Sequence, residues 1–270
     1  MNDNKISLRA LEIIITYRGA TTDRMVNLRS ILRHLDRTYT DYTLWVVEAD
    51  REPTFHWSEV GDDKVRHVFV CDEGPFSRAK LCNLGARLSR SPIICFHDAD
   101  MIAHPAALKH CLDDLLNNSE RDAWGPYERI VNVAGDLRTR FCETGDYALL
   151  DPYSEPTATL DPEMNILYMT NASGVTLIRR ERFFELGGFD AAFVGWGGED
   201  DDLLSRALRL GMGWYSLHNK FLFHLNHDSK TRAGWDQTPT GSENCNRSVA
   251  LRELSDEAFH ARIEQLRREV

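Results

Sequence analysis

The sequence predicts an α/β fold in which a mostly parallel sheet is flanked by helices. Short apolar runs rich in β-branched residues, such as LEIIIT (11–16) and PIICFH (92–97), are typical of strands that are buried on both faces. Segments with helical spacing of apolar residues lie between such runs, as in SRAKLCNLGARL (77–88). Strands that alternate with helices pair in parallel, because each helix carries the chain back to the edge where the previous strand began.

The N-terminal half supplies this alternation element by element. After the first strand, Thr22 or Asp23 can cap a helix. The apolar residues of this helix follow helical spacing: Met25, Leu28, Ile31, Leu32 and Leu35. Further strands are expected at 42–48 and 65–71. Pro105 suits the first turn of a helix that continues through AALKHCLDDLL.

The pattern of the second half changes from about residue 129 onward. A polar, proline-containing segment without clear periodicity indicates a long loop, and loops of this length are usually functional or disordered. We expect the following elements in order: a long loop over 139–165, a pair of strands in 166–180, a short helix at 180–186, a strand at 220–228, a mobile polar segment over 231–247 and an amphipathic helix over 254–270.

Composition limits the class of protein. The chain has 270 residues, of which 42% are apolar and 27% charged, as in ordinary soluble proteins. Its net charge of −10 argues against a general nucleic-acid binder, which needs a basic surface. The N-terminal segment does not have the pattern of a signal peptide, and no apolar run is long enough for a transmembrane segment. Six scattered cysteines without a CxxC pair are typical of reduced thiols. The expected location is the cytoplasm, free or peripheral at the inner membrane face.

Chemically useful side chains follow the predicted strands of the N-terminal half. The segments after the four strands read YRGA, ADRE, DEGPFSRAK and DADM. Ligands of parallel sheets bind at the carboxyl ends of the strands, so these segments are expected to meet in one site. Phe76 offers a ring for stacking, and Arg78 and Lys80 offer cations for phosphate or carboxylate groups.

Two further motifs are candidates for a metal site. In HDAD (97–100), Asp98 and Asp100 point the same way, because side chains alternate in an extended chain. Two such carboxylates can hold a divalent cation while a diphosphate completes its shell, although an Asp-rich turn is the simpler reading. In HLNH, His224 and His227 are three residues apart, and a site of histidine and carboxylate suits manganese.

The segment GWGGEDDD (195–202) places four acids at the start of a predicted helix. Negative charge there is favoured by the helix dipole by about 0.3–1 kcal/mol per group, which one or two acids would satisfy. The preceding WGG offers a flat ring and bare backbone, as sites that accommodate sugars do. A carboxylate crowded by other acids has a raised pKa, which suits a general base. We therefore expect one acid to act in chemistry and others to serve the helix.

The combined motifs resemble the β-1,4-galactosyltransferase family. They are FSRAKLCNLG, FHDADM, SGVTLIRRERFFELGGF, GWGGEDDD and FHLNHD, in this order. The chain is also similar to the bacterial chondroitin-polymerase and polypeptide N-acetylgalactosaminyltransferase modules. The resemblance covers about residues 10–235, and GWGGEDDD is its most specific part.

The resemblance implies a GT-A fold, which is a Rossmann-like, mostly parallel sheet flanked by helices, with a mixed acceptor-side lobe. The nucleotide-sugar-binding half is expected at 1–128, and the acceptor-binding and catalytic half at 129–248. A C-terminal amphipathic helix is expected at 249–270.

The resemblance also assigns the metal ligands and the donor site. Asp100, His224 and His227 match the metal ligands, and His224 stands where animal galactosyltransferases carry methionine. This difference favours a harder metal site, for which Mn²⁺ is expected and Mg²⁺ stays open. Tyr17 and Arg18 match a PFR-like segment that here lacks its proline. The expected nucleotide-sugar-binding residues are Thr16, Tyr17, Arg18, Glu48, Phe76, Arg78 and Asp98, the last near the ribose.

On the acceptor side, the resemblance implies that Trp196, Gly197, Gly198 and Glu199 bind the acceptor and that Asp200 is the catalytic base. The expected function is that of a metal-dependent inverting glycosyltransferase, which moves a hexose or N-acetylhexosamine from a UDP-sugar to a glycan acceptor. Bacterial surface polysaccharide synthesis is the expected context. The alternatives are a retaining enzyme of the polypeptide N-acetylgalactosaminyltransferase type, a nucleotidyltransferase, and a non-catalytic sugar-binding module on the same fold. Donor sugar, acceptor, linkage and oligomeric state stay open.

Overall fold

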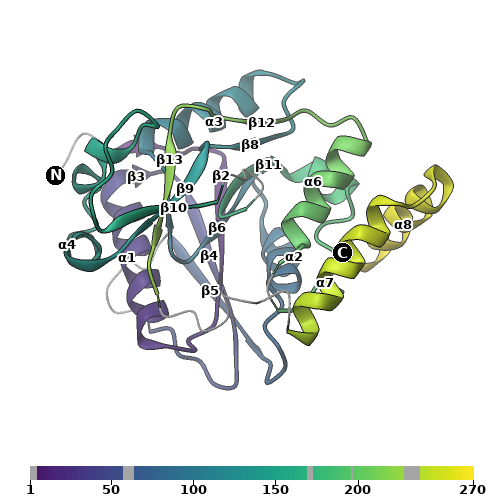
Figure 1. The fold of residues 1–270 in the computed structure, drawn as a ribbon. Coiled ribbons are helices and arrows are strands. Elements are labelled where there is room, and N and C mark those ends of the chain that lie inside the picture. Colours follow the sequence, from purple (N-terminus) through teal and green to yellow (C-terminus); the bar gives the residue numbers. More distant parts are fainter. Residues whose placement is uncertain (1–4, 57–63, 169–172, 196, 228–237) are drawn as a thin grey trace.

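The computed structural model describes residues 5–56, 64–168, 173–195, 197–227 and 238–270. Its centre is a seven-stranded sheet with helices on both sides (Figure 1). Across this sheet the strands are, in order, β12 (Trp214–Ser216), β8 (Ala123–Gly125), β11 (Val175–Arg179), β6 (Ile93–Asp98), β2 (Leu11–Tyr17), β4 (Thr43–Asp50) and β5 (Val65–Cys71).

The sheet is mostly parallel, as the alternation of strands and helices predicts. Strand β2 pairs in parallel with β4 and β6, and β4 pairs in parallel with β5. Strand β11 is antiparallel to its neighbours β6 and β8. The predicted α/β fold class is therefore confirmed, and the carboxyl ends of β2 and β6 lie side by side.

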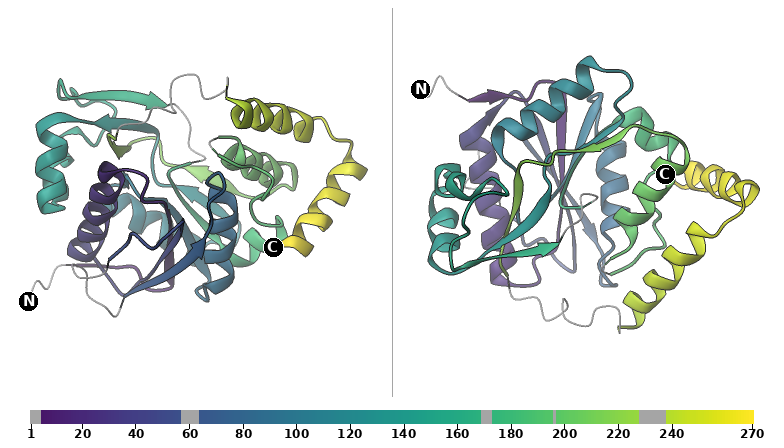
Figure 2. Two further views of the ribbon diagram at one scale, coloured as in Figure 1. Left: turned by 90° about the horizontal axis from the view of Figure 1, so that it is seen from below. Right: turned by 45° about the horizontal axis from the view of Figure 1, so that its top comes forward.

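Alternating side chains of the central strands build a core on each face of the sheet. In β2, Ile13 and Ile15 pack on one face, whereas Ile14 packs on the other. The first face is covered by α1 (Thr22–Thr38) and α3 (Pro105–Asn117), and the second by α2 (Arg78–Leu88), α5 (Arg180–Glu185) and α6 (Glu199–Arg209) (Figure 2). Burial of both faces explains why these strands read as continuous apolar runs.

The helices begin where polar side chains cap them. The side chain of Thr21 caps α1 by accepting a hydrogen bond from the backbone N–H of Arg24, whereas the predicted caps Thr22 and Asp23 lie in the first turn of the helix. Ser77 caps α2 in the same way. Pro105 lies in the first turn of α3, as predicted.

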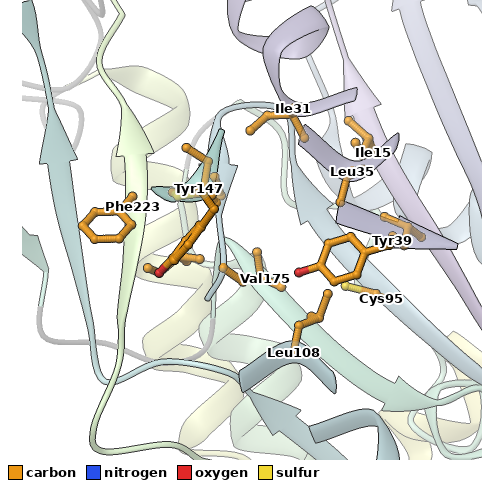
Figure 3. Packing of buried hydrophobic residues seen from close by; sticks show 14 of the residues in the cluster. Ile15, Ile31, Leu35, Tyr39, Cys95, Leu108, Tyr147, Val175 and Phe223 are labelled. Carbon is orange, nitrogen blue, oxygen red and sulfur yellow. The ribbon is translucent and has the colours of Figure 1, made fainter. Parts of the chain in front are cut away.

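A second, four-stranded sheet lies beside the first core. Its strands are, in order, β10 (Met164–Tyr168), β9 (Arg129–Val133), β13 (Phe221–Leu225) and β7 (Met101–Ile102), and a small third sheet pairs β1 (Ile6–Ser7) with β3 (Tyr39–Thr40). Figure 3 shows the shared core, in which Tyr147 and Phe223 lie on the side of the second sheet and Val175 on that of the first. This packing brings the end of β13 to the ends of β2 and β6.

The segment 139–165 is not the continuous loop that its polarity suggests. It contains the end of α4 (Gly135–Thr144) and two 3₁₀ turns, η1 (Tyr147–Leu149) and η2 (Asp151–Tyr153). Leu137 and Phe141 are four residues apart and bury their side chains in the core beside α1. Arg33 of α1 donates to the carbonyl oxygen of Cys142. Packing against a distant helix thus overrides the weak local signal.

The described part of segment 231–247 belongs to a helix, whereas its polar sequence predicts a mobile segment. From Pro239 onward the chain forms α7 (Pro239–Arg252), and residues 231–237 lie outside the described residues. The side chain of Thr238 caps this helix, and the buried Asn244 donates to the carbonyl oxygen of Val194 at 3.0 Å. The C-terminal amphipathic helix is confirmed as α8 (Asp256–Glu269).

The state of the cysteines and the hydropathy of the helices can be compared with the expectations from the sequence. All six cysteines are free thiols, and four of them are buried. None of the helices described combines the length and the apolar composition needed to cross a membrane. The division of the chain near residues 128 and 248 stays a prediction.

Candidate functional site

A cavity of about 690 Å³ opens at the carboxyl ends of β2 and β6. It brings together most of the residues predicted from the motifs: Thr16, Tyr17, Arg18, Phe76, Arg78, Asp98, Asp100, Gly197, Gly198, Glu199, Asp200, His224 and His227. Trp196 lies outside the described residues. Segments that are more than 200 residues apart in the chain thus share one site, as expected for the carboxyl edge of a parallel sheet.

At the end of β2, Arg18 supports the cavity wall by donating hydrogen bonds to backbone carbonyl groups. Its guanidinium group donates to the carbonyl oxygens of Ala49 at 2.7 Å, Gly74 at 2.8 Å and Asp72 at 3.0 Å. The same group lies over the ring of Phe76, 5.4 Å from its centroid. Arg18 therefore ties the end of β4 to the loop after β5 and lies over Phe76 at the cavity.

Lys80 is exposed and lies outside the cavity lining, and Glu48 is the other predicted residue among those described that does not line the cavity. Its side chain is fully buried, and Oε1 accepts hydrogen bonds from the backbone N–H and hydroxyl of Thr54 and from the backbone N–H of Phe55. Oε2 lies 2.8 Å from Nε2 of His67. Because both oxygens are engaged inside the protein, Glu48 orders the loop after β4, which corrects its predicted place on the nucleotide sugar.

Asp100, His224 and His227 form a cluster that can hold a metal ion. Their ligand atoms all lie within 4.8 Å of one another. Oδ2 of Asp100 is 3.1 Å from Nε2 of His227 and 3.7 Å from Nε2 of His224. Backbone pairing brings these three side chains together. The backbone N–H of Leu225 donates to the carbonyl oxygen of Asp100 at 2.8 Å, and β7, which follows Asp100, pairs with β13.

The surroundings of this cluster fit a divalent cation. The side chains of His224 and His227 are 1% and 7% exposed, and Nδ1 of His227 is buried without a hydrogen-bond partner among the described residues. Burial raises the pKa of Asp100, but the two histidines outweigh burial and lower it below its ordinary value. One carboxylate and two imidazoles are a donor set that Mn²⁺ accepts.

Asp98 does not join this cluster, although residue alternation alone places both aspartates on one metal. Nε of Arg78 donates to Oδ1 of Asp98 at 2.9 Å, and Nη1 donates to Oδ1 of Asp200 at 2.8 Å. Glu199 lies 3.7 Å from the same Nη1. Arg78 therefore links the end of β6 to the start of α6, and the two aspartates serve different neighbours.

The four acids of α6 have separate environments. Asp202 is buried and pairs with Arg206 at 2.7 Å, and Arg206 also donates to the carbonyl oxygen of Gly188. Asp201 is exposed to solvent. Glu199, Asp200 and Asp201 all line the cavity, the first two with largely buried side chains. The helix start thus supplies three cavity carboxylates and one structural ion pair, and the catalytic role of one acid stays a prediction.

Burial raises the pKa of Asp200 well above its ordinary value. The positive charge of Arg78 opposes this shift, whereas Glu199 and Asp98 add to it. Burial raises the pKa of Glu199 as well. A buried carboxyl group with a raised pKa that lines a cavity has the properties of a general base.

The glycine-rich loop before α6 requires left-handed backbone. Gly195, Gly197 and Gly198 have φ angles of 80°, 92° and 94°. The backbone N–H of Gly195 donates to the carbonyl oxygen of Phe76 at 2.8 Å, so the loop is tied to the segment that precedes α2. A Cβ atom on Gly198 would lie 2.7 Å from the ring of Phe193. Glycine is needed here for the backbone angle and for the close approach.

Gly198→Ala is expected to lower the free energy of unfolding by about 2–3 kcal/mol, because left-handed strain and overpacking add. Gly211→Ala is the matched control, since Gly211 also has a positive φ of 71° but has no atom within 4 Å of an added Cβ. This control is expected to lose about 1 kcal/mol. Urea unfolding of both variants measures the difference, and equal losses would show that the contact with Phe193 costs nothing.

Several cavity residues were not predicted from the sequence. Arg24 and Asn27 of α1 line the cavity, and the positive charge of Arg24 lowers the pKa of Asp100. From α7, the lining residues are Asn244, Cys245, Ser248, Val249 and Arg252. The spacing of the last four follows one face of a helix, which is a signal the sequence does contain. The polar composition of residues 239–252 makes this helical spacing hard to recognise in the sequence.

Comparisons with known proteins relate the chain to glycosyltransferases. A family model described as the N-terminal domain of galactosyltransferase matches residues 156–228. β-1,4-Galactosyltransferase 5 of Mus musculus is 28% identical over 204 residues, which are 74% of this chain and 38% of that protein. The β-N-acetyl-D-glucosaminide β-1,4-N-acetylglucosaminyltransferase of Lymnaea stagnalis is 37% identical over 231 residues, which are 84% of this chain and 36% of that protein. The chain thus spans less than two fifths of the length of either relative.

The fold has a counterpart among solved structures. Glucosyl-3-phosphoglycerate synthase from Mycobacterium tuberculosis, solved with Mn²⁺, UDP and phosphoglyceric acid, aligns with a TM-score of 0.52 and 14% identity over 92% of this chain and 80% of that one. Its fold is GT-A. This chain resembles galactosyltransferases in sequence and has the GT-A fold. The matched segment 156–228 contains the GWGGEDDD loop and both histidines of the candidate metal site.

Proposed function

We propose that this GT-A protein is a metal-dependent inverting glycosyltransferase, which transfers a hexose or N-acetylhexosamine from a UDP-sugar to a hydroxyl group of a glycan acceptor. The observation that carries the proposal is the convergence of two different centres in one cavity. The first is the histidine–carboxylate cluster around Asp100, and the second is the buried pair Glu199 and Asp200. Sugar transfer needs both a cationic centre for the leaving diphosphate and a base for the acceptor.

The donor is assigned to the side of the cavity that β2, β6 and β13 form. Asp100, His224 and His227 would hold a divalent cation, which supplies positive charge against the diphosphate as it leaves. Phe76 offers a ring for the uracil base. Arg24 and Arg78 also line the cavity, and Arg24 adds positive charge near Asp100, whereas Arg78 is already paired with Asp98 and Asp200.

The acceptor is assigned to the side of α6. Asp200 accepts the proton of the acceptor hydroxyl as its oxygen bonds to the anomeric carbon of the sugar. The bond from that carbon to the diphosphate breaks, and UDP leaves with the bonding electrons. Glu199, beside Asp200, would accept hydrogen bonds from acceptor hydroxyls. Direct attack of the acceptor oxygen on the anomeric carbon, opposite the leaving diphosphate, would invert the configuration of that carbon.

The sugar classes follow from the relatives. Their names assign galactosyl transfer to the mouse protein and N-acetylglucosaminyl transfer to the snail protein. Both are β-1,4-transferases by name, which supports a hexose or N-acetylhexosamine as the transferred group. Bacterial surface polysaccharide synthesis stays a prediction from the sequence.

Calorimetric titration of UDP tests the donor assignment first. We expect UDP to bind in the presence of Mn²⁺ and to lose most of this affinity in EDTA, because a cation held by Asp100, His224 and His227 would supply the positive charge that attracts the diphosphate. Binding with Mn²⁺ would justify assays with UDP-galactose and UDP-N-acetylglucosamine on glycan acceptors. Absence of UDP binding under both conditions would overturn the assignment and leave a sugar-binding module as the better explanation.

A further inference from the structure

A row of polar side chains crosses the four-stranded sheet and ends at the candidate metal site. Asn165 of β10 is the register partner of Asn132 of β9, and Asn132 is the register partner of His224 of β13. Register partners on adjacent strands project to the same face, so their side chains are neighbours. Asn165 is exposed and His224 is buried, so the row runs from the edge of the sheet into the cavity.

The hydrogen bonds in this row have one consistent direction. Nδ2 of Asn132 donates to Oδ1 of Asn165 at 3.3 Å, which leaves Oδ1 of Asn132 as an acceptor. That oxygen lies 2.9 Å from Nδ1 of His224, so the histidine donates from Nδ1. The other ring nitrogen, Nε2, then presents its lone pair toward Asp100, whose Oδ2 is 3.7 Å away.

We propose that Asn132 is a positioning residue that fixes the ring of His224 so that Nε2 is presented as a metal ligand. The inference rests on the metal site of the proposed function. Metal-binding histidines commonly donate their second ring nitrogen to a carbonyl or carboxylate oxygen, and loss of that partner weakens metal binding about 10–100-fold. Asn132 is 7% exposed and supplies such an oxygen from its amide.

The two histidines of the site differ in whether a side chain holds their Nδ1 atom. Nδ1 of His227 has no hydrogen-bond partner within the described part of the chain, whereas Nδ1 of His224 is held by Asn132. The ring of His224 is therefore already oriented before a metal binds, because its backbone lies in β13 and its side chain bonds to Asn132. His227 follows the strand and lies in the turn after it.

Titration of MnCl₂ into the purified protein without nucleotide tests the proposal directly, and it does not depend on transfer activity. Asn132→Leu keeps a similar volume but removes the acceptor, and Mn²⁺ affinity is expected to fall about 10–100-fold. Asn132→Asp restores an oxygen at the same place and is expected to bind Mn²⁺ within about threefold of the wild type. If Asn132→Leu does not fold, Asn132→Ala provides the same comparison.

Val131→Ala is the matched control for loss of stability. Val131 is the next residue of β9, fully buried on its opposite face, so this variant weakens the strand without changing the row of amides. Its Mn²⁺ affinity is expected to equal that of the wild type. Wild-type Mn²⁺ affinity in Asn132→Leu, or an equal loss in Val131→Ala, would overturn the positioning role alone. Failure of the wild type to bind Mn²⁺ would overturn the metal site as well.

Discussion

Asp200→Asn is expected to lower the rate of sugar transfer by about 10²–10⁴-fold, the range attributed to a general base. Asparagine has nearly the same shape and keeps an oxygen that can accept the hydrogen bond from Arg78, now 2.8 Å from the carboxylate. It cannot accept a proton from the acceptor hydroxyl. Because Asp200 is assigned to the acceptor side, UDP affinity in the presence of Mn²⁺ is expected to stay close to that of the wild type.

Glu181→Gln is the matched control for this experiment. It removes one negative charge from the first turn of another helix, α5, where the side chain is exposed and lies outside the cavity lining. Its transfer rate is expected to stay within about threefold of the wild type, because exposed charges are screened. Turnover of Asp200→Asn at the wild-type rate would refute the role of Asp200 as base.

The pH dependence of transfer provides a second readout for Asp200. A base acts in its ionised form, and burial raises the pKa of Asp200 well above its ordinary value. The rate is therefore expected to increase as the pH rises through that raised pKa and to level off above it. Asp200→Asn is expected to lose this limb of the profile. A rate that stays constant from acidic to neutral pH would contradict the raised pKa of the base.

His227→Ala is expected to weaken Mn²⁺-dependent UDP binding by about 100-fold or more, since loss of an outer partner alone costs 10–100-fold. Nε2 of His227 is 3.1 Å from Oδ2 of Asp100, so its removal opens one side of the cluster. Calorimetric titration of UDP at fixed Mn²⁺ concentration measures the loss. In EDTA, the variant and the wild type are expected to bind UDP equally weakly.

His218→Ala serves as the control for histidine removal. His218 is exposed and lies outside the cavity lining. Its UDP affinity is expected to match that of the wild type in Mn²⁺ and in EDTA. Unchanged Mn²⁺ dependence in His227→Ala would exclude His227 as a ligand and leave Asp100 and His224 as an incomplete site.

The sequence by itself determined the central sheet and the members of the site. Runs such as LEIIIT are buried on both faces, so their apolar composition alone identifies them as strands of a covered parallel sheet. The carboxyl ends of parallel strands share one edge, and this geometric rule is enough to place Arg18, Phe76 and Asp100 around one cavity. The acids of α6, His224 in β13 and His227 just after it joined this prediction through the family resemblance of their motifs.

The tertiary structure alone decided which of these residues face one another. Asp98 and Asp100 look equivalent in HDAD, but Arg78 engages the first and the two histidines engage the second. Glu48 follows the same strand-end rule as its neighbours, yet the loop that contains Thr54 encloses its carboxylate. These partners come from other elements of the fold, so the spacing of residues within one motif carries no information about them.

Helices α4 and α7 depend on tertiary structure for the same physical reason. Each has few apolar residues, and its local signal is too weak to predict a helix. α4 is stabilised where Phe141 packs beside α1, and α7 where Asn244 bonds to the chain before the glycine-rich loop. The row from Asn165 through Asn132 to His224 likewise exists only because three strands align in register. Contacts between residues far apart in the chain provide this stabilisation and alignment, and they form only when the chain folds.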